Sequence, residues 1–391
     1  MARKERIKCL QEKIKEYGLG CGLLFYSRDV FYYTGTAQPS YLVVLPEDYF
    51  LYVRSGFEFA ANDVFIEKDK MKEERRLENI FREISSRLMG KKIGTELDVL
   101  PAKQFLEFKE IFSGFDFTDI SPFVLEQRKR KDVFEIEKIR QACEAMDAGH
   151  KAVLSTLKEG TTELELAAAV ENAHRLAGHE GMVFMRQPDF VMSRGPIASG
   201  PNLLRFSGVV YSITGVGLSA SVPAGPSRRR IEKGDIVIVD IPTLVDGYHA
   251  DQTRTYVLGK ASEGIKAMYN ALREIEDYLI GNIRPGMKCS EAYRMAEEKS
   301  EELNVADAFL SFGNGKKTHM IGHGVGLECS EPPIVSKHEH SRLLDGYVIT
   351  LEMHMLREDA GVVKLEDMIL IKHSRNELLT KSPRRLFEIQ C

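Results

Sequence analysis

The chain has 391 residues, of which 43% are hydrophobic and 29% are charged, a composition typical of a globular protein of about two domains. Its formal net charge of −4 argues against nucleic acid or an anionic membrane as a partner. No run of about 18 apolar residues predicts a transmembrane helix, and the charged N-terminal segment lacks the apolar core of a signal peptide.

The first part of the chain predicts an α/β domain over residues 1–127. Short apolar segments bounded by glycine, proline or acidic residues predict strands, and longer segments with helical spacing predict helices. The strands are expected at 21–27, 41–46, 49–55 and 91–100, and the helices at 1–18, 73–90 and 102–112.

A charged stretch, EQRKRKD at 126–132, follows this domain. It has no apolar periodicity, and a solvated linker is favoured over a nucleic-acid patch because the chain as a whole is negatively charged. Beyond it, apolar residues recur at helical spacing from Ile136 to Val153. This spacing predicts a long helix that opens a second domain over residues 128–391.

Helices and groups of strands follow one another in the second domain, which predicts an α+β architecture. A capping box of Thr162 and Glu165 begins another helix. His150 and His174 lie in the first two helices and are interpreted as structural or surface residues. An Asp-Gly pair at 246–247 predicts a turn between antiparallel strands. Further strands are expected at 231–241, 245–259, 346–356 and 361–373, and further helices at 265–283 and 290–303.

Four carboxylates interrupt the apolar strands of the second domain. A charged side chain in a core strand is costly unless it is paired or binds a cation. One such residue has an ordinary explanation, but four in one domain, with a histidine in the glycine-flanked loop GHGVG, require a common one. The residues are Asp240, Asp251, Glu352, Glu366 and His323.

A pair of divalent metal ions accounts for this set. Two such ions cancel the charge of four carboxylates, and at a separation of about 3.5–4 Å they share a hydroxide nucleophile and polarise a carbonyl group. Oxygen-rich ligation favours Mn, Fe, Co or Zn. The glycines around His323 would let the backbone approach the site closely. The GHGVG stretch lacks the third glycine of a dinucleotide-binding loop and the lysine of a P-loop. The remaining alternative is that His323 is a hydrogen-bonded core histidine.

These residues and their motifs, VDGYHADQTRTYVLG, GHGVGLECSEPP, TLE and KLED, resemble the pita-bread metallopeptidases, in the branch of prolidase and Xaa-Pro aminopeptidase. The resemblance covers the whole chain. It implies a creatinase-like N-terminal α/β domain at 1–127 and an α+β pita-bread catalytic domain at 128–391.

The resemblance also implies a role for each ligand. Asp240 would bind one metal ion, and Asp251 and Glu366 would bridge both ions. His323 and Glu352 would complete the second ion.

Two further roles are implied near these ligands. Glu352 would also carry a proton during catalysis. His319, four residues before His323, matches a family position that contacts the substrate.

The sequence departs from the family where two substrate-binding histidines are expected. Pro223 or Ala224 stands at the first position and Ser330 at the second. Their loss should weaken stabilisation of the charge that develops on the scissile carbonyl oxygen. His354 shares a strand face with Glu352, and the hypothesis is that it enters the pocket and partly replaces a missing histidine.

Two more basic residues lie close to the ligands in sequence. Lys364 replaces the arginine of the family and shares a strand face with Glu366, so it is a candidate to neutralise a ligand carboxylate. His249, two residues before Asp251, is a weaker candidate for the site.

The resemblance implies a hydrolase that cleaves the Xaa-Pro amide bond of short peptides with a hydroxide held by two metal ions. The replaced histidines leave two alternatives, a metal enzyme acting on a non-peptide substrate as an amide hydrolase or lyase, and a binding protein with weakened catalysis. A homodimer is expected from the N-terminal domain. Six scattered cysteines without a CxxC pair predict reduced thiols in a cytoplasmic protein.

Overall fold

The computed structural model describes residues 3, 5–187, 195–208 and 212–390. The chain divides into two compact units, Met1–Asp132 and Val133–Cys391, and each is described by itself. Helix α6 (Ser121–Lys129) extends across residue 127, where the sequence places the end of the first domain. Among the described residues, no helix has the length and apolar character needed to cross a bilayer.

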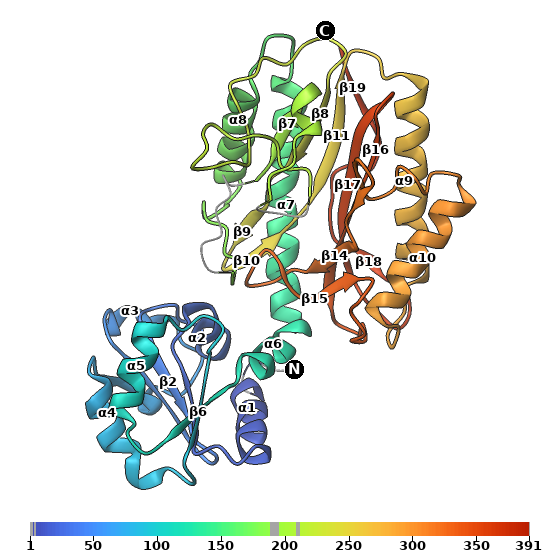
Figure 1. Ribbon diagram of the computed structural model, residues 1–391. Coiled ribbons are helices and arrows are strands. Elements are labelled where there is room, and N and C mark those ends of the chain that lie inside the picture. The colour runs from blue at the N-terminus through green and yellow to red at the C-terminus, as the bar shows by residue number, and fades with distance from the viewer. Residues whose placement is uncertain (1–2, 4, 188–194, 209–211, 391) are drawn as a thin grey trace. The chain divides into compact units, whose positions relative to one another are not determined.

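The first unit is an α/β domain with helices around a central sheet (Figure 1). The sheet is mixed and six-stranded, with the order β4-β3-β2-β1-β5-β6. Its strands are β1 (Cys21–Leu24), β2 (Ser40–Val44), β3 (Tyr49–Val53), β4 (Met71–Glu73), β5 (Lys92–Thr95) and β6 (Asp116–Asp119). Its helices are α1 (Glu5–Glu16), α2 (Ser27–Thr34), α3 (Phe57–Asp63), α4 (Leu77–Ile84), α5 (Ala102–Ile111) and α6.

The core of the first unit forms where apolar side chains of β1, β2, β3 and β5 pack with those of α4 and α5. The strands and helices expected from apolar segments are therefore confirmed. Helix α2 was not expected, because its eight residues are too short to display a clear helical period.

The prediction that EQRKRKD is a solvated linker is wrong. The stretch begins within α6, where the Arg128 side chain is only 2% exposed and pairs with the buried Asp29 at 2.8 Å. The backbone carbonyl of Tyr32 and the carboxylate of Asp132 accept hydrogen bonds from Arg6 of α1. The charges of this region thus hold helices together within the first unit.

In its described residues, the second unit contains the larger sheet and four long helices. Its helices are α7 (Val133–Thr156), α8 (Glu163–Leu176), α9 (Glu263–Asn282) and α10 (Cys289–Glu302). Its strands are β7 (Ile197–Ser199), β8 (Ile236–Asp240), β9 (Thr243–Val245), β10 (Tyr248–Ala250), β11 (Thr253–Leu258), β12 (Ser311–Gly313), β13 (Lys316–Lys317), β14 (Met320–Gly324), β15 (Glu331–Ser336), β16 (Val348–Arg357), β17 (Gly361–Leu370), β18 (Glu377–Leu378) and β19 (Phe387–Ile389).

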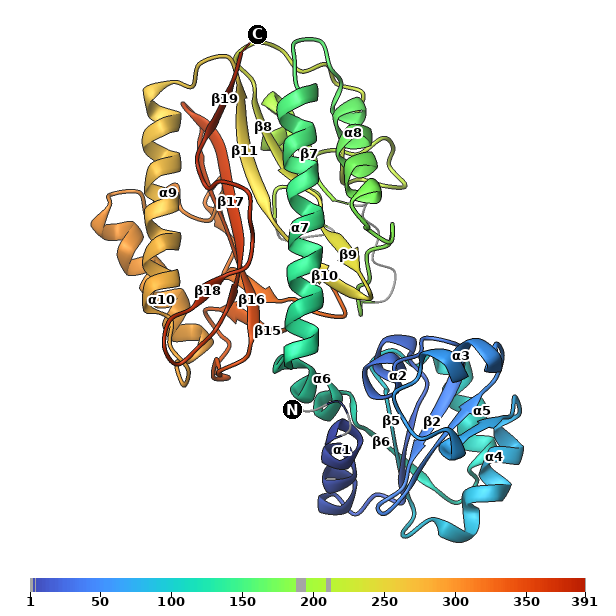
Figure 2. The same ribbon diagram turned by 180° about the vertical axis from the view of Figure 1, so that it is seen from behind.

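The large sheet runs in the order β15-β14-β16-β17-β11-β8-β7, and its neighbours along this path are antiparallel. Helices α9 and α10 form one layer, in which α9 lies beside β16 and β17 and α10 lies beside β15, whereas α7 and α8 lie beside β7, β8 and β11 (Figures 1 and 2). One apolar core fills the first of these layers and a second core fills the other. The expected α+β arrangement is confirmed.

Two short-range sequence predictions are confirmed in the second unit. Thr162 accepts a hydrogen bond from the backbone of Glu165, whose side chain accepts one from Thr162, so the predicted capping box is present. Asp246 and Gly247 adopt positive φ values of 49° and 82°, as a tight hairpin turn requires. This turn joins β9 to β10, while β8 pairs with β11.

Candidate metal centre

The register of the large sheet places three of the predicted carboxylates in one row across four strands. Glu352 on β16 lies opposite Glu366 on β17. Glu366 lies opposite Thr253 on β11, and Thr253 lies opposite Asp240 on β8. Like charges placed directly opposite one another destabilise a sheet, so Glu352 and Glu366 require a positive charge nearby.

The other two predicted ligands, Asp251 and His323, lie on the same face of the sheet, displaced from this row by two residues along the strands. Asp251 precedes Thr253 by two residues, and His323 on β14 pairs with Thr350, two residues before Glu352. Because side chains alternate along a strand, these positions share the face of the carboxylate row. His323, which was expected in a glycine-flanked loop, therefore lies on a strand, because β14 pairs with both β15 and β16.

The five side chains form two overlapping groups of possible ligands. Asp251, His323 and Glu366 make the first group, and Asp240, Glu352 and Glu366 make the second. In each group, one ligand atom per residue lies within 4.8 Å of the others. Glu366 belongs to both groups, as a residue that bridges two ions would. The second oxygen of Glu352 also lies 3.7 Å from Nε2 of His323, so Glu352 faces both groups.

Hydroxyl groups orient two of the ligands. Thr253 and Thr350 donate hydrogen bonds to the two oxygens of Glu366, at 2.7 and 2.9 Å. Ser212 donates to Oε1 of Glu352 at 2.5 Å. Sequence reasoning did not assign a role to these three residues. The strand period could have indicated the two threonines, which lie two positions from a ligand, but no sequence signal indicates Ser212.

Burial and mutual repulsion oppose ionisation of most of the carboxylates. Burial, and then the charges of neighbouring carboxylates, raise the pKa of Asp251 and Glu366 well above the usual range. Burial also raises the pKa of Asp240, although Lys364 acts against it. Glu352 is the exception, because Lys364 and His323 outweigh its burial and lower its pKa to about 2. The site holds more negative charge than its own side chains neutralise.

Lys364 lies on the face that its position in β17 predicts. Its side chain is fully buried, and its ammonium lies 2.6 Å from Oε1 of Glu352 and pairs with Oδ2 of Asp240. These carboxylates raise the pKa of Lys364 well above the usual range, against the effect of burial. Lys364 therefore contributes a positive charge to the second ligand group.

The first group fits a metal ion by an independent observation. Oδ1 of Asp251 is buried and has no hydrogen-bond partner among the described residues. Its other oxygen accepts a hydrogen bond from the Cys329 thiol at 3.2 Å. Burial, together with the charge of Asp251, raises the pKa of that thiol well above the usual range, so it remains protonated. A buried carboxylate oxygen without a donor fits a metal ligand.

The glycines around His323 have a different purpose from the expected one. A Cβ atom on Gly322 would lie 2.0 Å from the Thr350 carbonyl oxygen, and one on Gly324 would lie 2.4 Å from the Pro332 carbonyl oxygen. These glycines therefore let β14 pack tightly between β15 and β16. They position His323 indirectly, and the expectation that they give clearance to the metal site itself is corrected.

His249 supports the site from outside. Its Nε2 accepts a hydrogen bond from the Phe184 backbone, and its Nδ1 lies 3.1 Å from the Gly326 carbonyl oxygen. The backbone N–H of His249 also donates to Gly326. With both ring nitrogens engaged by main chain, His249 fixes the loop that follows His323.

The two predicted catalytic histidines lie in different surroundings. His354 is buried on β16, which continues to Arg357, and its Nε2 lies 3.0 Å from the Ser311 carbonyl oxygen. Burial lowers the pKa of His354 to about 4, so the ring is neutral at pH 7. His319 is exposed just before β14, with its ring 5.8 Å from that of His338. Their catalytic roles remain predictions.

The positions of the two missing histidines are occupied by small side chains. Ala224 is fully buried, Pro223 is half-buried, and Ser330 is half-buried in the loop between β14 and β15. None of the three side chains can supply the imidazole expected there. Part of the segment between β7 and β8, at 209–211, lies outside the described residues.

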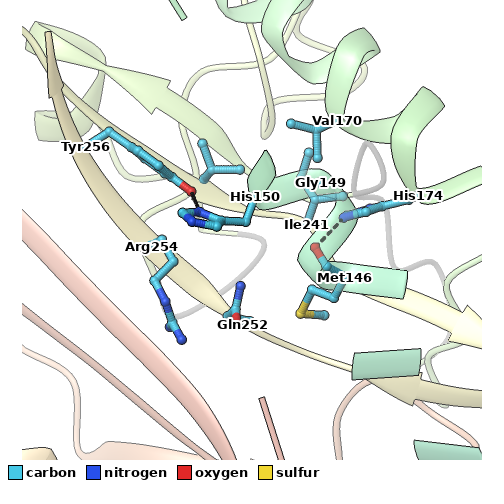
Figure 3. A pocket seen from close by; sticks show the side chains of 10 residues that line it. Met146, Gly149, His150, Val170, His174, Ile241, Gln252, Arg254 and Tyr256 are labelled. Carbon is cyan, nitrogen blue, oxygen red and sulfur yellow. Dashed lines mark hydrogen bonds between the residues drawn. The ribbon is translucent and has the colours of Figure 1, made fainter. Parts of the chain in front are cut away.

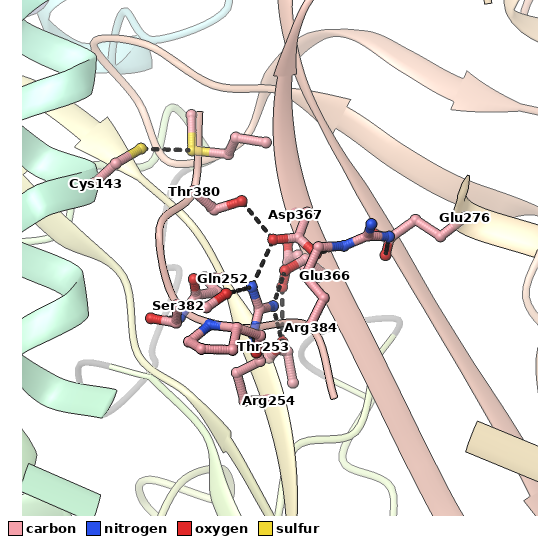
Figure 4. A network of polar contacts seen from close by, with 12 residues as sticks. Cys143, Gln252, Thr253, Arg254, Glu276, Glu366, Asp367, Thr380, Ser382 and Arg384 are labelled. Atoms are coloured by element: carbon pink, nitrogen blue, oxygen red, sulfur yellow. Dashed lines mark hydrogen bonds and ion pairs between the residues drawn. The ribbon is translucent and has the colours of Figure 1, made fainter. Parts of the chain in front are cut away.

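A buried ion network lies behind Glu366 (Figure 4). Asp367 accepts hydrogen bonds from Arg254 at 2.6 Å, from Arg384 at 2.7 Å and from Thr380. Arg254 also donates to the backbone carbonyl of Glu366 at 2.8 Å. The network thereby ties the backbone of a predicted ligand to β11 and to the C-terminal segment.

A separate small pocket lies beside α7 and α8 and is lined by His150, His174, Gln252 and Arg254, among others (Figure 3). Nδ1 of His150 lies 2.7 Å from the Tyr256 hydroxyl, and Nε2 of His174 lies 3.3 Å from the carbonyl oxygen of Met146. Burial lowers the pKa of both histidines to about 4. Both are buried, and their bonds within the fold agree with a structural role.

Both units match models of known protein families. Residues 137–373 match Metallopeptidase family M24, and residues 6–130 match the Creatinase/Prolidase N-terminal domain. The chain is 29% identical over 386 residues to the Xaa-Pro dipeptidase of Pyrococcus furiosus, covering 98% of this chain and 99% of that protein.

Solved structures extend the comparison to the fold. The prolidase from Pyrococcus horikoshii OT3 has a TM-score of 0.80 and 27% identity, covering 97% of this chain and 99% of that one. The Xaa-Pro dipeptidase from Bacillus anthracis, 24% identical, shares the fold over the full length of both chains with a TM-score of 0.83. The chain therefore belongs to metallopeptidase family M24, a family of peptide hydrolases, and combines its pita-bread catalytic domain with a creatinase/prolidase N-terminal domain.

Proposed function

We propose that this protein hydrolyses the Xaa-Pro amide bond of short peptides with two divalent metal ions, Mn, Co, Zn or Fe. The observation that carries the proposal is the convergence of three buried carboxylates, the partly buried Glu352 and one imidazole on one face of the sheet. The relatives named Xaa-Pro dipeptidase and prolidase support the choice of substrate.

Each side chain has a role in this proposal. Asp240, Asp251, His323, Glu352 and Glu366 hold the ions, which supply Lewis-acid activation of water and of the scissile carbonyl group. Glu352 accepts a proton on a carboxylate oxygen and passes it to the leaving nitrogen. Thr253 and Thr350 keep Glu366 oriented through their hydrogen bonds. His319 contacts the substrate.

A second candidate is a metal enzyme that acts on a non-peptide substrate, as an amide hydrolase or lyase. The small residues Ala224 and Ser330 favour it, because the imidazoles expected there would stabilise a developing oxyanion. His249 does not replace them, since main-chain groups engage both of its ring nitrogens. A binding protein with weakened catalysis is less consistent with a complete set of ligands.

The test combines metal content with a substrate screen. The purified protein is stripped with a chelator, reloaded with Mn²⁺ or Co²⁺, and assayed on Xaa-Pro dipeptides, longer Xaa-Pro peptides and non-peptide amides. We expect Asp251→Asn to lose metal and dipeptide hydrolysis together, by more than about 100-fold in activity. Asp359→Asn, at an exposed carboxylate paired with Arg357, is the control and should keep both.

The outcomes separate the candidates. Hydrolysis of non-peptide amides without cleavage of Xaa-Pro peptides supports the second candidate and contradicts the first. Metal binding without turnover of any substrate supports the binding protein. Full activity in the stripped enzyme, or in Asp251→Asn, contradicts both metal-dependent readings.

We further propose that the protein acts in the cytoplasm as a homodimer. The five described cysteines form no disulfide, which agrees with a reducing compartment. Light scattering of the purified protein tests the dimer, and a monomer at micromolar concentration would refute it.

A further inference from the structure

Lys364 occupies an unusual place among the predicted ligands. It lies on β17 two residues before Glu366, so the two side chains share a face of the strand. Its fully buried ammonium pairs with Asp240, lies 2.6 Å from Oε1 of Glu352 and lies 3.9 Å from Oε2 of Glu366. These three residues are the complete second group of ligands.

The two ligand groups therefore differ in what they already hold. In the first group, Oδ1 of Asp251 is buried without a hydrogen-bond partner among the described residues, so it can accept a cation directly. In the second group, the ammonium of Lys364 already contacts an oxygen of Asp240 and an oxygen of Glu352. The ammonium lies farther from the first group, at 3.9 Å from Oε2 of Glu366, the residue that the two groups share.

We propose that Lys364 is a built-in cation of the second ligand group, so that the two metal positions of this chain are unequal. The first divalent ion binds to Asp251, His323 and Glu366. A second ion binds only when it displaces the ammonium from Asp240 and Glu352. This inference rests on the proposed metal site, but it concerns the occupancy of that site and not the substrate.

Geometry explains why the ammonium and a second ion compete. A metal ion bound to a carboxylate oxygen lies about 2.0–2.2 Å from it, and Nζ of Lys364 lies 2.6 Å from Oε1 of Glu352. Two cations bound to the same pair of oxygens would therefore be in close repulsive contact. The Lys364 side chain is fully buried, so water cannot readily receive a displaced ammonium.

The type of cation matters as well as its charge. A lysine ammonium is a compact point charge on a flexible stem, whereas a guanidinium is planar and spreads its charge over a rigid fork. A lysine can thus insert its charge between two ligand oxygens in the way a metal ion does. Replacing Lys364 by arginine keeps the charge but not this shape.

The experiment measures metal binding and does not depend on catalysis. Chelator-stripped protein is titrated with Mn²⁺ by calorimetry, and the metal retained after dialysis is counted by elemental analysis. For the wild type we expect one tightly bound Mn²⁺ per chain and a second bound about 100-fold more weakly. For Lys364→Met, which keeps the length of the side chain, we expect the second affinity to rise by about tenfold or more, as removal of one competing charge implies.

Two controls accompany this variant. Lys372→Met removes a lysine that pairs with Glu377 away from the ligands, and it should leave both affinities unchanged. Lys364→Arg should give a second affinity that differs from both the wild type and the methionine variant. Two equally tight ions in the wild type, or an unchanged second affinity in Lys364→Met, would overturn the proposal.

A further comparison does not depend on the folding of Lys364→Met. Asp240→Asn changes only the second group, so it should retain the first Mn²⁺ with an affinity within about threefold of the wild type. Asp251→Asn should lose it. Loss of the first ion in Asp240→Asn would overturn its assignment to Asp251, His323 and Glu366.

The two proposals fail in different ways. A wild type that binds no metal refutes the proposed function itself. A wild type that binds two equal ions and cleaves Xaa-Pro peptides refutes only the role of Lys364.

Discussion

Replacing Arg254 by methionine should destabilise the catalytic unit and weaken the metal site together. The side chain of Arg254 is only 1% exposed, and all five of its N–H groups have acceptors. The acceptors are Asp367 and the backbone carbonyls of Thr253, Glu366, Ser382 and Pro383. Methionine has a similar length but donates no hydrogen bond, so it leaves these acceptors without their partner.

The magnitude follows from the loss of one partner of a buried ion pair. Breaking such a pair costs about 3–5 kcal/mol when the other charge stays buried. Asp367 keeps Arg384 and Thr380, which favours the lower end of this range. For a unit of this size each kcal/mol corresponds to roughly 2–4 °C in Tm, so Tm should fall by about 10 °C. Release of the Glu366 carbonyl should also weaken metal binding by about tenfold.

The assay combines thermal unfolding of the metal-free protein with Mn²⁺ titration at 25 °C. Arg140→Met is the matched control, because Arg140 pairs with Glu377 at 2.8 Å where both side chains are about one-third exposed. Such a pair contributes about 1 kcal/mol or less. Arg254→Lys should remain destabilised, since an ammonium has three donors and no fixed fork.

Two results would contradict this reasoning. A free energy of unfolding for Arg254→Met within about 1 kcal/mol of the wild type would show that the network contributes little to stability. A destabilised variant that still binds Mn²⁺ with wild-type affinity would show that Arg254 does not position Glu366.

The remaining predictions concern two buried histidines. His354→Phe preserves packing against Phe312 but removes Nε2. Turnover should fall on the order of 100-fold while the metal content stays constant. Unchanged turnover in a stopped assay at saturating substrate would show that His354 is not a catalytic residue. His150 has a pKa of about 4 in the folded protein, below its unfolded value of about 6.5, so the stability that its neutral ring contributes is complete above pH 6.5 and is lost as pH falls towards 4. His150→Asn retains a hydrogen-bond partner for the Tyr256 hydroxyl, and its free energy of unfolding in urea should decline less steeply between pH 6.5 and 4 than that of the wild type. His373→Asn, at an exposed position, is the control and should decline as the wild type does. Equal slopes in all three proteins would contradict the contribution of His150 to this pH dependence.

Strand alternation and charges within apolar segments were enough to select the candidate ligands of the metal site. Alternation along β16 and β17 was enough to assign Glu352, His354, Lys364 and Glu366 to one face, because a strand reverses side-chain direction at every residue. The capping box at Thr162 and the turn at 246–247 were also legible, since they depend on residues only a few positions apart. A charged residue within an apolar strand is also informative from sequence alone, because burying an unpaired charge costs free energy whichever group compensates it.

How these residues meet depends on contacts between strands that are formed only in the folded chain. The pairing of β16, β17, β11 and β8 sets which carboxylates lie opposite one another, and the register of β11 against β17 brings together Thr253 and Glu366, which are 113 residues apart in the chain. It also showed that Arg128 is buried rather than solvated, that Gly322 and Gly324 serve strand packing, and that the ammonium of Lys364 lies between two predicted ligands. Local sequence cannot specify these outcomes, because each depends on the contacts of a neighbouring strand or helix that the chain brings there only on folding.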